Sequence, residues 1–176
     1  MHPLLATTRL HRAPISYDVT FTPSARTVLD RTTHSAIPPH TLSQPATEPP
    51  TPISSRLVLR SHKFPWPIVV GIGSSSFGKP ASSTNGVITN LDILYAIHTT
   101  LLTPITPEEW EALGHGSRAQ MRVTKAYEER CVRMGGGWEG GVRRVDWLGG
   151  KTRLVGIEVD KVEGGKGVGK LVFGRA

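Results

Sequence analysis

The sequence has few of the residues that secreted, membrane-bound and zinc-dependent proteins need. It is 176 residues long with one cysteine, Cys131, which excludes an internal disulfide and favours a reducing compartment. No apolar run approaches the roughly 20 residues that span a bilayer, and the first residues are too weakly apolar for a signal peptide. None of the seven histidines stands four residues from another, the spacing of a helical zinc site. We therefore expect an intracellular protein (cytoplasm or nucleus) with no membrane partner, metal or cofactor.

Two glycine-rich stretches resemble the phosphate-binding loop of nucleotide hydrolases but lack its last residue. They are 73–79 and 164–170, and each ends in Gly-Lys. That loop needs a Ser or Thr after the lysine, because the hydroxyl binds magnesium. Here Pro80 and Leu171 follow, so nucleotide hydrolysis is not expected.

Helix signals are clear in the second half of the chain. Thr89 and Thr106 each precede an apolar-periodic stretch, with an acidic residue three positions later. The first of these helices should end near Thr103, and the second should be short. A longer helix spans roughly 117–134 and ends at three glycines.

Strand signals complete an α+β domain that covers residues 1–176. The strands predicted by alternation, by β-branched residues or by a two-residue glycine turn are 15–21, 56–60, 68–72, 142–148, 151–157 and 170–173. The pair around Gly149 and Gly150 is predicted to be a hairpin. We expect a mainly antiparallel sheet of about five to six strands, with two to three helices packed on one face.

Residues 24–55 differ from the rest in composition. Six of the 14 prolines lie between Pro38 and Pro52, among Ser, Thr and Gln. Such a segment buries too little apolar surface to offset its ordering entropy. We predict a largely irregular surface segment within the domain, attached at Ile37 or Leu42.

Two charged residues at apolar positions, Arg130 and Asp146, suggest a structural ion pair. Arg130 lies in the middle of an apolar stripe of the long helix, and Asp146 stands between two apolar residues. A charge near a core is normally paired, because its desolvation alone costs several kcal/mol. We predict a partly buried pair of Arg130 with Asp146 or Asp18. The alternative is that Arg130 extends to solvent and Asp146 is hydrated.

Trp66 and Trp138 are predicted to lie in loops, the first between two prolines and the second among glycines. Such tryptophans either attach the loop to the body, which is the favoured role, or anchor a partner. Arg143 and Arg144 open the predicted hairpin and are the candidate contacts for an anionic partner.

Seven segments in the same order resemble a known family: 3–5, 17–18, 46–50, 65–68, 89–94, 104–110 and 142–149. The most specific is Arg-Arg-Val-Asp-Trp-Leu-Gly, residues 143–149. Together they are similar to a family of uncharacterised fungal domains, found chiefly in mushroom-forming fungi. The resemblance implies one compact intracellular domain and brings no activity, cofactor or catalytic residue with it.

Three classes of function are compatible with these patterns. A non-catalytic protein-interaction module, using the segments around Trp66 and Trp138 and the proline-rich stretch, is favoured. The net charge of +7, concentrated after residue 117, leaves binding of nucleic acid or another polyanion as an alternative. Its basic residues would be Arg143, Arg144, Lys151 and Arg153 of the hairpin. A small enzyme would need a pocket that gathers His98 with Asp18 or Asp146, and this class is the least favoured.

Overall fold

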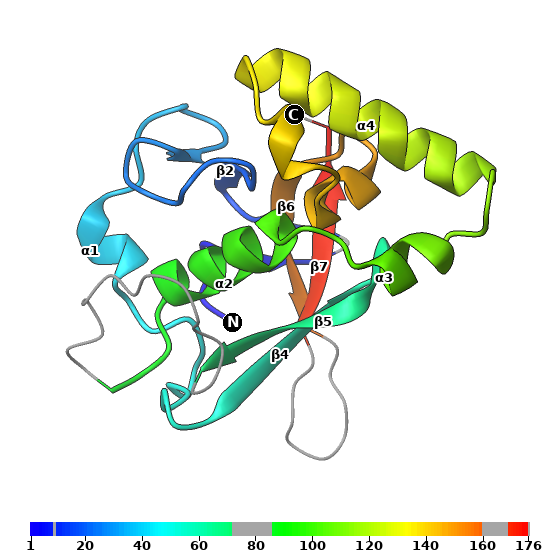
Figure 1. Cartoon of the computed structure of the whole chain (residues 1–176). Coiled ribbons are helices and arrows are strands. Elements are labelled where there is room, and N and C mark those ends of the chain that lie inside the picture. Colours follow the sequence, from blue (N-terminus) through cyan, green and yellow to red (C-terminus); the bar gives the residue numbers. More distant parts are fainter. Residues whose placement is uncertain (9, 72–85, 160–168, 176) are drawn as a thin grey trace.

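The computed structural model describes residues 1–8, 10–71, 86–159 and 169–175, which form an α+β fold (Figure 1). The sheet is seven-stranded, in the order β3-β2-β6-β7-β4-β5, with β1 beside β6. Its strands are β1 (Ala6–Thr7), β2 (Ile15–Asp18), β3 (Val28–Asp30), β4 (Arg56–Ser61), β5 (Phe64–Gly71), β6 (Arg153–Val159) and β7 (Gly169–Gly174).

The sheet is larger than predicted and it is mixed. The β2–β3, β2–β6, β4–β5 and β6–β7 pairs are antiparallel, whereas β1–β6 and β4–β7 are parallel. One edge of β6 is shared, since Leu154 is paired with Tyr17 of β2 and Ile157 with Ala6 of β1. Strands as short as β1 and β3 leave no period-two pattern, so the sequence did not reveal them.

The four helices described are α1 (Pro39–Leu42), α2 (Asn90–Leu102), α3 (Pro107–Glu111) and α4 (Arg118–Met134). The predicted starts of α2 and α3 are confirmed. The Thr89 hydroxyl accepts a hydrogen bond from the backbone N–H of Asp92, whose carboxylate accepts one from the N–H of Thr89. Thr106 and Glu109 form the same capping box on α3. Helix α4 ends at Gly135.

The predicted hairpin after α4 is wrong. Residues Arg144–Leu148 form a 3₁₀-helix, η2, and a second short one, η1, spans Trp138–Gly140. Val145 and Leu148 are buried while Trp147 is half-buried. Three residues per turn places Val145 and Leu148 on the same side, which a strand would not do. Gly149 and Gly150 do make a turn, but β6 pairs with β2, β1 and β7 instead.

Helix α2 packs directly on the sheet, and the 3₁₀-helix η2 contacts both α2 and α4. Helix α2 packs against β5 and η2, and α4 packs on η2. Figure 1 shows the end of α2 in front of β6, with α4 running along the upper side of the molecule. The largest fully buried side chains include Ile93, Leu94 and Ile97 of α2 and Leu154 and Ile157 of β6. Thus η2 packs against both α2 and α4.

The proline-rich stretch 24–55 contains β3 and α1 and sends apolar side chains into the body. Ile37 and Leu42, the two predicted attachment points, are both buried, and so is Ala46. Pro45 forms a bridge with Thr89. Most of its other prolines lie at the surface.

Within the described residues, no helix is long and apolar enough to cross a membrane. The glycine-rich stretch 73–79 lies outside the described residues, and so does 164–168 of the second stretch.

Candidate functional site

Arg130 and Asp146 form a buried bidentate ion pair between α4 and η2. The Arg130 Nε lies 2.7 Å from Asp146 Oδ1, and Nη2 lies 2.9 Å from Oδ2 and 3.1 Å from the Gly141 carbonyl oxygen. These hydrogen bonds to Asp146 raise the pKa of Arg130 above its ordinary value. Since Asp146 lies on a 3₁₀-helix and not on the predicted strand, the pair joins helix to helix. Asp18 instead lies 3.7 Å from Arg133 Nη1.

Trp66 is packed into the fold on β5, and its predicted loop is wrong. Its ring stacks on Phe64 at 5.3 Å and meets Trp147 edge-on at 5.0 Å. The flanking prolines, Pro65 and Pro67, are exposed. They lie on β5, the last strand in the described sheet order, and an edge strand tolerates residues without a backbone N–H. Trp66 is therefore attached to the body.

Arg144 completes the packing around Trp66. Its guanidinium lies 4.9 Å from the centre of the Trp66 ring, and its Nη2 lies 2.6 Å from Glu109 Oε1. Both side chains of this ion pair are about one-fifth exposed (22% and 19%). Arg144 thus has a cation–π contact and a carboxylate within the fold.

Trp138 is held at one edge and is otherwise open. It lies on η1 with 49% of its surface exposed. Tyr127 of α4 meets its ring edge-on at 5.6 Å, and the Tyr127 hydroxyl donates a hydrogen bond of 2.8 Å to the Trp138 carbonyl. The backbone of η1 is therefore fastened to α4, while half of the indole stays available.

A hollow of about 280 Å³ lies beside η1 at the end of α4. It is lined by Thr20, Leu102, Arg130, Met134, Gly136, Gly137 and Arg143. Two arginines but no carboxylate are among these residues. The hollow therefore favours a negatively charged group.

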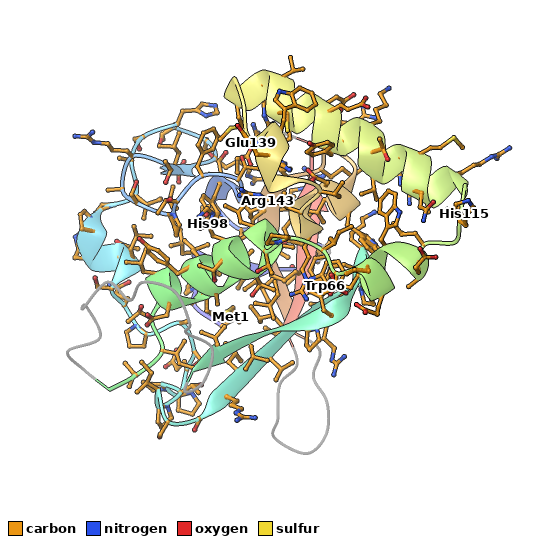
Figure 2. The ribbon with its side chains drawn as sticks, viewed as in Figure 1. Met1, Trp66, His98, His115, Glu139 and Arg143 are labelled. Atoms are coloured by element: carbon orange, nitrogen blue, oxygen red, sulfur yellow. The ribbon has the colours of Figure 1, made fainter. Side chains whose placement is uncertain are left out.

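Arg143 differs from its neighbour Arg144 in having no acid for its guanidinium. Its backbone N–H binds Asp146 Oδ2 at 2.8 Å, but its side-chain Nε is buried and has no hydrogen-bond partner among the described residues. The guanidinium lies against Gly140, where an added Cβ would come 2.9 Å from Nη2. Figure 2 shows Arg143 near η1 and Trp66 toward α3, so the two arginines point to separate places.

Exposed apolar residues line this hollow or stand next in the chain to residues that line it. Met134 lies on the same stripe of α4 as the buried Val123, Ala126 and Arg130, yet 48% of its surface is exposed. Phe21, which follows the lining residue Thr20, is 44% exposed. We call Phe21, Met134, Trp138 and Arg143, with the hollow between α4 and η1, the α4-end surface.

A second hollow of about 220 Å³ adjoins Arg130. Its lining residues are Ala126, Glu129, Arg130, Arg133, Val145, Asp146, Gly150 and Thr152. Two carboxylates face two arginines there, so the charges balance.

His98, the histidine named for a catalytic alternative, makes a structural contact. It is buried, and its Nδ1 donates a hydrogen bond of 2.9 Å to the Val19 carbonyl. Burial lowers the pKa of His98 below its ordinary value. Neither His98 nor Asp18 lines either hollow. No group of three metal-ligating side chains occurs in the part of the chain that the structure describes.

The four basic residues named for polyanion binding are not presented by a hairpin. Arg144 is engaged with Glu109, and Arg153 lies within the sheet, paired in register with Asp18 and Gly174. The predicted hairpin that would have carried these four residues is therefore not formed, because residues 144–148 are a 3₁₀-helix.

The sequence analysis missed the hollow itself. Arg130 and Arg143 were singled out there, but Thr20, Leu102 and Met134 were not. One signal was available, because Gly135, Gly136 and Gly137 follow the helix directly and have no side chains to cover its last turn.

A family model, described as a family of unknown function (DUF6699), matches residues 15–167. The chain belongs to this family. No curated protein and no solved structure matches the chain. The DUF6699 match includes every residue that lines the two hollows, so both lie within the family domain.

Proposed function

We propose that this DUF6699 domain is a non-catalytic protein-interaction module that binds its partner through the α4-end surface. The observation that carries the proposal is the exposure of Met134 and Trp138 beside the hollow. Both are large apolar side chains that α4 and η1 leave about half open (48% and 49%). Aromatic residues, Met and Arg are the types enriched at the centres of protein interfaces.

The remaining polar side chains singled out by the sequence serve the scaffold. Arg130 is bound to Asp146, Arg144 to Glu109 and His98 to the Val19 carbonyl. Each of these contacts joins separate parts of the fold, and this structural role supports binding over catalysis.

The proposal includes the origin of the protein and its location in the cell. A fungal origin rests on the sequence resemblance alone. A location in the cytoplasm or nucleus is supported by the single cysteine, Cys131, which is free and buried.

Selection of peptide ligands on the whole chain tests the proposal. Random peptides displayed on phage are selected against the chain, and the affinities of the selected peptides are measured by titration calorimetry. We expect Trp138→Ala to weaken binding about tenfold or more, because truncated interface tryptophans typically cost upwards of about 2 kcal/mol.

Val132→Ala is the matched control on the same helix. Val132 is 73% exposed, but it lies about 200° around α4 from Arg130 and so faces away from the hollow. Its substitution should change affinity less than about twofold. Failure to select any peptide, or equal binding by both variants and the wild type, would overturn the proposal.

A further inference from the structure

We infer that the hollow at the α4-end surface binds an acidic side chain of the partner, with Arg143 as the group that recognises its carboxylate. The inference rests on the proposed function and names the chemistry of the ligand. The partner segment would be a peptide with an Asp or Glu next to an apolar residue.

The charges around the hollow favour an anion. Its lining includes Arg130 and Arg143 but no Asp or Glu. Asp146 neutralises Arg130 through two short hydrogen bonds. No ion pair of Arg143 occurs among the described residues. One positive charge therefore remains uncompensated at this site.

Arg143 also has a buried donor to satisfy. Its Nε is inaccessible to solvent and has no acceptor in the described part of the chain. Buried donors in native proteins are nearly always paired, since an unmade hydrogen bond costs about 1–3 kcal/mol. A carboxylate can accept from Nε and from a terminal nitrogen of the same guanidinium, which is the common bidentate geometry. Because Nε is inaccessible to solvent, the Arg143 side chain must move toward the ligand before both bonds form.

The size and walls of the hollow suit an acidic side chain. Its volume of about 280 Å³ leaves room for one such side chain. Leu102 and Met134 supply apolar wall next to the arginines. Such a site suits the methylene stem and charged end of an acidic residue. The exposed Met134 and Trp138 then accommodate an apolar neighbour.

The absence of a side chain at Gly140 provides the room for the Arg143 guanidinium. An added Cβ would lie 2.9 Å from Nη2 and 3.6 Å from Cζ. Gly140 is not among the residues with positive φ, so alanine fits its backbone. Gly140→Ala should therefore displace the guanidinium while keeping both the charge and the fold.

The test uses the peptides selected above, each made with Glu or Asp and with the matching Gln or Asn. We expect the amide form to bind the wild type about tenfold or more weakly, as loss of a charge-assisted hydrogen bond requires. Arg143→Gln should bind both forms alike. Gly140→Ala should reduce the preference for the acid, while Val132→Ala should retain it.

Each outcome separates the inference from the proposed function. If Trp138-dependent peptides bind equally well as acid and amide, the inference is wrong and the interaction module stands. If binding does not depend on Trp138, the proposed function fails first. If duplex DNA displaced the bound peptide as well as the free acidic peptide does, the ligand of the hollow would be a polyanion and not an acidic peptide. Should Arg143→Gln unfold, as circular dichroism would show, Gly140→Ala still decides the question.

Discussion

Two clusters in this protein use the same kinds of side chain and differ in how completely they are enclosed. In the first, Trp66 is stacked on Phe64, meets Trp147 and lies under Arg144, which has Glu109 as its carboxylate. In the second, Tyr127 is the aromatic ring that meets Trp138 in the described part of the chain, where Arg143 has no ion pair. The difference shows that a tryptophan–arginine pair does not by itself indicate a binding site.

The neighbours of each tryptophan account for the difference. Trp66 lies on β5 beside other aromatic residues, whereas Trp138 is preceded by three glycines and followed closely by Gly140. Glycines provide no atoms to cover an indole. The open cluster is therefore the one whose sequence neighbours lack side chains.

The largest expected effect comes from breaking the buried ion pair of Arg130 with Asp146. Arg130→Ala should lower the free energy of unfolding by about 3–5 kcal/mol, because Asp146 stays buried without its partner. Urea titration followed by circular dichroism measures the loss. Arg133→Ala is the control, since Arg133 is 43% exposed and 3.7 Å from Asp18, and it should cost less than about 1 kcal/mol. A loss below about 1 kcal/mol for Arg130→Ala would contradict the role of the pair.

A smaller effect on the free energy of unfolding distinguishes Trp66 from Trp138. Trp66→Ala should lower the free energy of unfolding by about 3 kcal/mol, as removal of a packed aromatic ring does. Trp138→Ala should cost about 1 kcal/mol or less, because it loses one edge-on contact. The same urea titrations decide this point. Similar losses for the two variants would mean that the clusters do not differ in enclosure.

The smallest expected effect is a pH dependence of the free energy of unfolding that comes from His98. This residue lies on α2 and donates a hydrogen bond to the carbonyl of Val19, which precedes Thr20 of the hollow. Burial lowers its pKa below the ordinary 6.5. Above that value both folded and unfolded states are neutral, so the residue contributes no pH dependence. As the pH falls below it, the unfolded state binds the proton more readily and stability decreases.

The measurement compares urea unfolding at pH 7.5 and pH 5.5. His98→Gln should show a smaller loss of stability between these two values than the wild type does. His115→Gln, at an exposed histidine, should behave as the wild type. An identical loss in His98→Gln and the wild type would show that His98 does not titrate differently on folding.

The features that depend on near neighbours in the chain were predictable. Thr89 with Asp92 and Thr106 with Glu109 lie three residues apart, so a capping box can be recognised locally. The parallel pairings of β6 with β1 and of β7 with β4 bring together segments more than 100 residues apart. No local pattern encodes such contacts, and the sheet was therefore underestimated.

The candidate site was predictable only in its residue types. Arg130, Arg143 and Trp138 were singled out from the sequence, but the direction of the Arg143 side chain depends on η2, which begins directly after it. Because residues 144–148 form a 3₁₀-helix, Arg143 turns to the hollow and Arg144 to Trp66. A strand would also have sent neighbouring residues to opposite sides, but onto the two faces of a sheet.

The chain reversal after α4 limits how the mouth of the hollow can vary. Gly135, Gly136 and Gly137 have φ values of 69°, 155° and 87°, and an added Cβ at any of them meets nothing within 4 Å. Backbone conformation alone therefore makes larger residues unfavourable there, although the surrounding space would admit them. The part of the hollow that Gly136 and Gly137 line is therefore bare backbone, with no side chain to cover it.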